Sequence, residues 1–214
     1  MIDGPRIDPA SGGAARSLVI LLHGYGSNGE DLIGLGVDWR AALPDTAFVS
    51  PDAPEPCPGA PDGYQWWDIA SLDPAARAAG AAGAAPVLDA FIDAELARHG
   101  LTEAELALVG FSQGTMMALQ VGLRRPRTLA GIVGYSGMLA NADGLAGPGI
   151  TRPPVLLLHG DADPMIPVAA MRQAEADLAR NGFAVETHVS RGLGHGIDMQ
   201  GLALGRRFLT QVLG

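Results

Sequence analysis

The chain contains no lysine, because all 14 of its cationic side chains are arginine. It therefore has no lysine to form a Schiff base, nor the phosphate-binding lysine of kinases and phosphate-loop NTPases. Except for two adjacent pairs, the arginines are scattered along the chain, and the formal net charge is −9. A protein of this charge is not drawn to a phosphate backbone, so we expect no nucleic-acid partner.

Cysteine and long apolar runs are also scarce. The single cysteine, Cys57, can form neither an intrachain disulfide nor a cysteine-rich metal site. No run approaches the roughly 18 apolar residues of a membrane-spanning helix. The first residues lack the basic and apolar regions of a signal peptide. We therefore expect a soluble, cytoplasmic protein without membrane insertion.

What the sequence has instead is alternation between two kinds of segment. Short runs rich in Val, Ile and Leu alternate with longer alanine-rich stretches at helical spacing, as parallel strands alternate with crossover helices. We expect residues 1–214 to form a single domain, a three-layer α/β sandwich around a mostly parallel sheet. The predicted strands are Ser17–His23, Ala47–Ser50, Ala104–Gly110, Leu129–Tyr135, Val155–His159 and Phe183–Val189.

Five helices are predicted between these strands. The second contains Gly80, Gly83 and Pro86, so we expect it to become regular only after the proline. The predicted helices are Asn28–Arg40, Pro74–His99, Gln113–Arg124, Pro167–Asn181 and Asp198–Leu213.

Two segments rich in proline or glycine, residues 51–63 and 141–154, are expected to be surface or active-site loops rather than domain linkers. Neither is long enough to form a large lid. We therefore expect a minimal lid over an open cleft.

The main chemical signal is L-A-L-V-G-F-S-Q-G-T-M-M-A-L, Leu106–Leu119. An apolar strand enters G-x-S-x-G and continues as a helix. This context is typical of a nucleophile elbow, a sharp turn that exposes a serine hydroxyl at the carboxyl edge of a sheet. The pattern predicts Ser112 as a nucleophile, the alternative being a serine that merely caps a helix.

A serine nucleophile needs a base and an acid that orients the base. Asp161 and Asp163 follow the predicted strand that ends at His159, and His195 lies between glycines after the last predicted strand. The chain order serine, aspartate, histidine is that of α/β-hydrolases, and each residue follows a strand. We therefore predict a triad of Ser112, His195 and one of these two aspartates.

At these motifs the chain resembles the small carboxylesterase, acyl-protein thioesterase and lysophospholipase group of α/β-hydrolases. The resemblance implies an α/β-hydrolase fold and hydrolysis of an ester or thioester with no metal and no organic cofactor. Its serine nucleophile separates it from similar dienelactone hydrolases, which use cysteine. The matching segments are L-L-H-G-Y-G-S-N-G (Leu21–Gly29), P-D-A-P (Pro51–Pro54), Trp66-Trp67-Asp68, G-F-S-Q-G, H-G-D-A-D-P-M-I-P and G-L-G-H-G.

The resemblance also assigns roles to single residues. Asp163, the aspartate directly before proline, stands at the family's triad position, whereas Asp161 is expected to form a turn and is the alternative acid. The backbone N–H groups of Gln113 and, by resemblance, Tyr25 are expected to bind the oxyanion. Relatives commonly have a smaller or aliphatic residue where this chain has Tyr25.

The remaining histidines are expected to be structural. His159 closes a strand, where a buried hydrogen bond is expected, and His23 should shape the loop after the first strand. His99 suits a helix C-terminus and His188 lies within a strand.

The substrate pocket is the least determined part of the prediction. Met and aromatic side chains in loops that should face Ser112 suit an apolar acyl chain. The alternative for Trp66 and Trp67 is packing in the core. The predicted pocket residues are Trp66, Trp67, Met138, Met165 and Ile166.

We therefore expect a serine carboxylesterase acting on small to medium acyl esters. Acyl-protein thioesterase and lysophospholipase activity are the alternatives within this class. A ligand-binding α/β-hydrolase homologue with little turnover is the alternative outside it. The small-molecule ester is the expected partner, and the resemblance also implies a possible homodimer.

Overall fold

A seven-stranded sheet forms the centre of the computed structural model, which describes residues 2–71 and 73–214. The strand order is β1-β3-β2-β6-β7-β8-β9, and only β1 runs antiparallel to its neighbour. The strands are β1 (Arg6–Ile7), β2 (Ser17–Leu22), β3 (Thr46–Val49), β6 (Leu106–Phe111), β7 (Gly131–Tyr135), β8 (Val155–Gly160) and β9 (Val185–Ser190).

The central strands are almost entirely apolar because both faces of the sheet are covered. In β2, Leu18, Ile20 and Leu22 pack into one core, whereas Val19 and Leu21 pack into the other. Successive side chains of a strand point to opposite faces, so a strand buried on both sides needs an uninterrupted apolar run.

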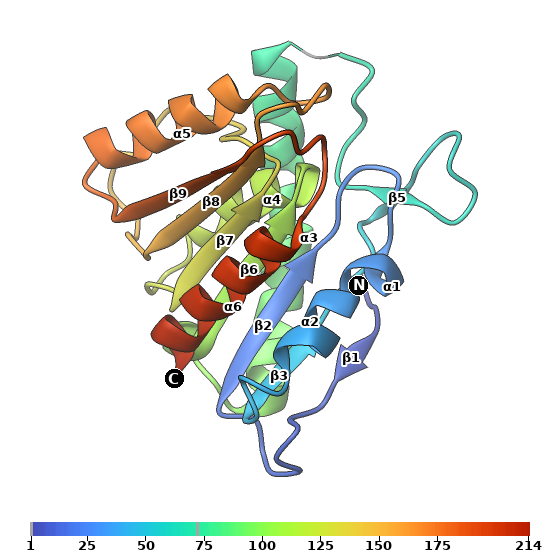
Figure 1. The fold of residues 1–214 in the computed structure, drawn as a ribbon, viewed down its shortest axis with the longest axis vertical. Coiled ribbons are helices and arrows are strands. Elements are labelled where there is room, and N and C mark those ends of the chain that lie inside the picture. The colour runs from blue at the N-terminus through green and yellow to red at the C-terminus, as the bar shows by residue number, and fades with distance from the viewer. Residues whose placement is uncertain (1, 72) are drawn as a thin grey trace.

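Helices form the two outer layers (Figure 1). Helices α3, α4 and α5 cover one face of the sheet, and α1, α2 and α6 cover the other. The predicted three-layer sandwich with a mostly parallel sheet is confirmed. The helices are α1 (Gly29–Leu32), α2 (Gly34–Trp39), α3 (Pro74–His99), α4 (Gln113–Gly122), α5 (Val168–Arg180) and α6 (Met199–Leu213).

Two predicted elements are subdivided. The helix expected over 28–40 is interrupted at Ile33 and forms α1 and α2, in a stretch where Gly34 and Gly36 weaken helix propensity. The strand expected to begin at Ala104 is preceded by a 3₁₀ turn, η1 (Glu103–Glu105), so β6 begins at Leu106. Thr102 and Glu105 form a capping box around that turn, which holds it out of the sheet.

The irregular start expected for the second helix is wrong, because α3 is helical from Pro74 through Pro86. Asp73 caps it by accepting a hydrogen bond from the Ala75 N–H, at 2.7 Å. Gly80 is explained by packing: a Cβ there would lie 2.4 Å from the Trp67 indole. Gly80 thus leaves room for the Trp67 ring to pack against α3, and it does not interrupt the helix.

Three short strands were not predicted. β1 pairs with β3 over two residues, and β4 (Glu55–Pro56) pairs with β5 (Tyr64–Gln65) within the proline-rich loop. Two-residue strands carry no periodic pattern that the sequence could reveal. The loop is also tied to the segment after β2, because Tyr64 N–H donates to the Ser27 carbonyl at 2.7 Å.

No helix formed by residues 2–71 and 73–214 is both long enough and apolar enough to span a lipid bilayer.

Candidate active site

Ser112 occupies a sharp turn between β6 and α4. Its φ of 55° and ψ of −115° lie outside the regions favoured by non-glycine residues. The turn closes because its neighbours approach other backbone segments closely. A Cβ on Gly110 would lie 2.4 Å from the Gly114 carbonyl, and one on Gly114 would lie 1.8 Å from the Leu22 carbonyl oxygen. The conformation expected of a nucleophile elbow is therefore present, with Ser112 half-buried.

The end of β7 fixes this turn from the neighbouring strand. Ser112 N–H donates to the Tyr135 carbonyl at 2.9 Å. The Thr115 hydroxyl lies 2.8 Å from both the Gly110 and the Tyr135 carbonyl oxygens. These contacts join the strand, the turn and the helix into one rigid unit. Thr115 is a supporting residue that no sequence signal distinguishes from an ordinary helical threonine.

Asp163 follows β8, and each of its carboxylate oxygens accepts hydrogen bonds. Oδ1 accepts from the backbone N–H groups of Met165 at 2.8 Å and Ile166 at 3.0 Å. Oδ2 lies 2.7 Å from Nδ1 of His195. The side chain is fully buried. The structure thus joins Asp163 to His195, as the sequence predicted.

These contacts also determine the ionisation of Asp163. Burial raises the pKa of its carboxyl, but the N–H donors of Ile166, His195 and Met165 outweigh burial and hold the pKa below its usual value. The carboxylate is therefore ionised at neutral pH and available to stabilise a positive charge on His195.

Asp161, the alternative acid, has a different role. Its side chain is exposed, and Oδ1 accepts a hydrogen bond from the Gly192 N–H at 2.6 Å. It therefore ties the end of β8 to the loop that carries His195. The bond joins residues 31 positions apart, so Asp161 links two loops and does not make the local turn contact predicted for it.

His195 lies on the loop between β9 and α6, with its side chain 20% exposed. Its ring centroid is 5.0 Å from that of Phe111, the residue before Ser112. The Ser136 hydroxyl donates to the Gly196 carbonyl at 3.1 Å, which anchors the loop to the end of β7. These contacts bring His195 to the side of the nucleophile elbow.

Across the described residues, no hydrogen bond of 3.5 Å or less joins the Ser112 hydroxyl to His195. Such contacts are often long without substrate and tighten in the reacting complex. The structure therefore joins Asp163 and His195 by a direct hydrogen bond. Ser112 is placed near His195 indirectly, by the contact of Phe111 with the His195 ring and by the bond from Ser136 to the His195 loop.

The two predicted oxyanion donors flank Ser112. Gln113 is the first residue of α4, and the loop with Tyr25 follows Gly24, where a Cβ would lie 3.2 Å from the Ser112 Cβ. Neither the Gln113 nor the Tyr25 backbone N–H donates to another group within residues 2–71 and 73–214. Both amides thus remain able to bind a ligand oxygen.

The Gln113 side chain has a structural role that the sequence did not suggest. Its Oε1 accepts from the Trp66 N–H and its Nε2 donates to the Trp67 carbonyl, both at 2.9 Å. It is buried, and these two bonds give both the oxygen and the nitrogen of its amide a partner. The nucleophile elbow is in this way fixed to the segment after β5.

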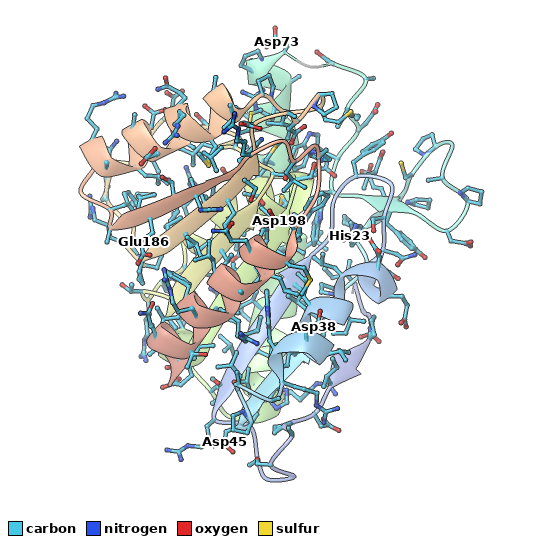
Figure 2. All side chains as sticks on the ribbon, viewed as in Figure 1. His23, Asp38, Asp45, Asp73, Glu186 and Asp198 are labelled. Carbon is cyan, nitrogen blue, oxygen red and sulfur yellow. The ribbon has the colours of Figure 1, made fainter. Side chains whose placement is uncertain are left out.

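His23 shapes the loop after β2, as predicted. Its Nε2 accepts from the Ala53 N–H at 2.9 Å, so its Nδ1 donates to the Gly24 carbonyl at 2.8 Å. Burial lowers the pKa of the ring, which keeps it neutral. Figure 2 labels His23 at the carboxyl end of β2, and Asp45 at the opposite edge of the sheet.

The five predicted pocket residues do not share one surface. Trp66, Trp67 and Ile166 are buried in the core between the sheet and α3–α5, where Trp66 Nε1 donates to the His23 carbonyl at 3.0 Å. Met165 is 70% exposed. Met138 is half-buried and lines a cavity. The two tryptophans therefore pack in the core, which was the alternative to a place in the pocket.

That cavity has a volume of about 520 Å³ and lies between α3, α5 and the segment after β7. Ser112 and His195 are not among its lining residues. Its link to the nucleophile elbow is Met138, because a Cβ on the preceding residue, Gly137, would lie 2.9 Å from the Ser112 carbonyl oxygen. Most of its lining is apolar. The lining residues are Pro74, Ala75, Arg77, Ala78, Met138, Leu139, Ala140, Asn141, Ala142, Asp143, Ala170, Gln173, Ala174 and Asp177.

Residues 2–71 and 73–214 contain no group of three or more His, Cys, Asp or Glu side chains arranged to hold a metal ion.

Comparison with known proteins gives consistent results. A sequence profile described as phospholipase/carboxylesterase matches residues 6–213. Esterase YpfH of Escherichia coli is 30% identical over 86% of this chain and 78% of its own length. Acyl-protein thioesterase 1 of Schizosaccharomyces pombe is 29% identical over 94% of this chain and 93% of its own. The crystal structure of esterase PE8 is 47% identical, covers 99% of both chains and superposes with a TM-score of 0.94.

The lowered pKa of Asp163 predicts how stability depends on pH. Its carboxylate stabilises the fold above the unfolded-state pKa of about 3.9, and this contribution is lost as the pH falls through the lower folded-state pKa. Asp163→Asn should therefore lower the free energy of unfolding by about 2 kcal/mol at pH 7. In urea titrations at pH 7 and pH 3, the difference from the wild type should shrink at the lower pH. Asp161→Asn, at an exposed carboxylate, is the control, and an equal pH dependence in both variants would contradict the prediction.

Proposed function

Since the chain belongs to the phospholipase/carboxylesterase family, we propose that it is a serine carboxylesterase acting through Ser112, His195 and Asp163. The observation that carries the proposal is the 2.7 Å contact between His195 Nδ1 and the buried, ionised Asp163, beside the strained turn at Ser112. The chain is an ester hydrolase, as are the relatives named esterases.

The first half of the reaction forms an acyl-enzyme. Ser112 Oγ attacks the acyl carbonyl carbon while His195 Nε2 takes the hydroxyl proton. Asp163 accepts the Nδ1–H hydrogen bond, which fixes the tautomer and stabilises the imidazolium. The carbon–oxygen bond to the alcohol then breaks, and the alcohol leaves with the proton from His195.

Water completes the cycle by the same route. His195 takes a proton from water as the water oxygen attacks the acyl carbon of the ester on Ser112. The bond to Ser112 Oγ then breaks and the serine recovers its proton from His195. The products are a carboxylic acid and an alcohol, and no cofactor is consumed.

The tetrahedral intermediate in each half carries a negative oxygen. We assign its stabilisation to the N–H groups of Gln113 and Tyr25, whose freedom from other hydrogen bonds within the described chain supports the role. Because the donors are backbone amides, the Gln113 side chain is free to hold Trp66 and Trp67.

We propose that the acyl chain enters the cavity that begins at Met138. Its volume of about 520 Å³ and its alanine, methionine and leucine walls suit a medium-length chain. Met165, exposed beside Asp163, would lie at the rim of the cleft. Small to medium acyl esters are therefore the proposed substrates, and residues 1–214 are taken as one cytoplasmic domain.

Thioester hydrolysis is a second candidate, favoured by the similarity to an acyl-protein thioesterase over 94% of this chain. The same serine chemistry releases a thiol instead of an alcohol. Lysophospholipid hydrolysis requires the same attack on an ester. A homodimer stays an expectation from the family resemblance.

Removal of the nucleophile tests the proposal. With p-nitrophenyl acetate, butyrate and octanoate, Ser112→Ala should lower kcat by about 10⁴-fold or more, because no acyl-enzyme can form. Ser11→Ala, at an exposed serine, is the control and should retain wild-type turnover. Turnover that survives Ser112→Ala would rule out this mechanism, and a wild-type chain inactive on every ester would favour a ligand-binding homologue.

Filling the cavity tests the acyl site. Ala170, half-buried on α5, lines the cavity, whereas its neighbour Ala169 is exposed and does not. Ala170→Phe should lower kcat/KM for the octanoate ester by about tenfold, because the ring occupies the space of the chain, and leave the acetate ester within about twofold. Ala169→Phe should change neither. Equal losses on both esters would place the acyl chain elsewhere.

A further inference from the structure

The strand that leads to Asp163 carries a second histidine beside the same carboxylate. His159 lies in β8, four residues before Asp163, and its side chain is fully buried. We propose that His159 is a positioning residue, whose Nε2–H holds the Asp163 turn so that the carboxylate faces His195. This inference rests on the proposed function, since it concerns the acid of that reaction.

The contacts of Nε2 carry the proposal. It lies 2.8 Å from the Ile166 carbonyl oxygen and 3.3 Å from Asp163 Oδ2. A carbonyl oxygen only accepts, so Nε2 bears the hydrogen and donates to Ile166, with Oδ2 as a second, longer acceptor. Oδ2 is also the oxygen that contacts His195. One carboxylate oxygen thus lies between two imidazole rings.

Ile166 closes this arrangement. Its N–H donates to Asp163 Oδ1 at 3.0 Å, and its carbonyl accepts from His159. Ile166 thus holds Asp163 Oδ1, and it is itself held by the His159 ring, which lies beside Oδ2. Removing the His159 donor would free the Ile166 carbonyl and leave the orientation of the carboxylate to the backbone amides and His195 alone.

The surroundings of the other ring nitrogen, Nδ1, explain why His159 can position Asp163 without neutralising its negative charge. Nδ1 is buried and has no hydrogen-bond partner within the described residues. A proton there would be an unpaired buried donor, which is costly. The ring is therefore bound as the neutral Nε2–H tautomer, and the negative charge of Asp163 remains available to His195.

The two aspartates closest in sequence to Asp163 and His195 accept backbone hydrogen bonds of their own. Asp161 accepts from the Gly192 N–H at 2.6 Å, and Asp198 accepts from the Gly201 N–H at 2.6 Å. Within the part of the chain that the structure describes, the basic side chains with a nitrogen within 4 Å of the Asp163 carboxylate are those of His159 and His195. A change in the behaviour of the His195–Asp163 pair after mutation at 159 can thus be attributed to this contact.

The test compares three variants with the wild type. His159→Leu removes the donor, and His159→Gln keeps an N–H group at the position of Nε2. His188→Leu is the matched control, because His188 lies on the adjacent strand β9, paired with Leu158, and is not in contact with Asp163. Thermal unfolding is measured for each, and His159→Asn, which cannot reach Ile166 with its amide, replaces the leucine variant if that variant does not fold.

In ester turnover, His159→Leu should lower kcat by about tenfold with little change in KM, less than the loss from removing the acid itself. The acid limb of the kcat/KM profile, where the His195–Asp163 pair takes up a proton, should move to lower pH, because a displaced carboxylate stabilises the imidazolium less. His159→Gln should restore most of both properties, and His188→Leu should change neither. A purely structural role would lower activity without moving the acid limb.

A second measurement does not depend on turnover. The proton on His195 Nδ1, held by Asp163, should give a downfield NMR resonance that is lost or shifted in His159→Leu and retained in His159→Gln. If the wild type proves inactive on esters, this resonance still decides whether His159 positions Asp163. The proposal is overturned if the leucine and glutamine variants lose activity equally with an unmoved acid limb, or if the resonance is the same in both variants and the wild type.

Discussion

The close backbone approach at the turn between β6 and α4 is the constraint on which the rest of the site depends. Gly114 lies so near the Leu22 carbonyl that a Cβ would overlap it, and a Cβ on Gly110 would likewise overlap the Gly114 carbonyl. This packing holds Ser112 in a conformation that a free chain would avoid. The conformational energy is offset by hydrogen bonds that Ser112 and Thr115 donate to the Tyr135 carbonyl of β7, and by those of the buried Gln113 side chain. A serine that would otherwise cap a helix is thereby placed, half-buried, at the carboxyl edge of the sheet.

Because all but one of the sheet's strands are parallel, their carboxyl ends meet at that edge. β8 delivers Asp163, the loop after β9 delivers His195, and the loop after β2 delivers the Tyr25 amide. Burial alone would raise the pKa of the aspartate. The two amides and the His195 ring that donate to it keep it ionised, so the fold supplies a fixed negative charge where the reaction develops a positive one. The contact with His159 belongs to the same arrangement.

The sequence was sufficient for the layers and for the positions that local patterns encode. Apolar runs located the six longer strands, and the glycines around Ser112 located the turn. What it could not provide depends on packing between distant segments. Gly80 suggested a weak helix, whereas it admits Trp67, and no local pattern links Gln113 to the two tryptophans or His159 to Asp163. The two-residue strands pair only because longer elements bring them together.

The central claim is that Ser112 becomes covalently acylated. The most direct test is incubation of the wild-type chain with a fluorophosphonate ester, which mimics the attacked carbonyl and is not hydrolysed, followed by mass spectrometry of the peptides. The account predicts a single adduct on Ser112, formed much more slowly in Asp163→Asn because His195 is then no longer held by a carboxylate. An adduct on a different residue, or none under conditions in which the chain hydrolyses esters, would contradict it.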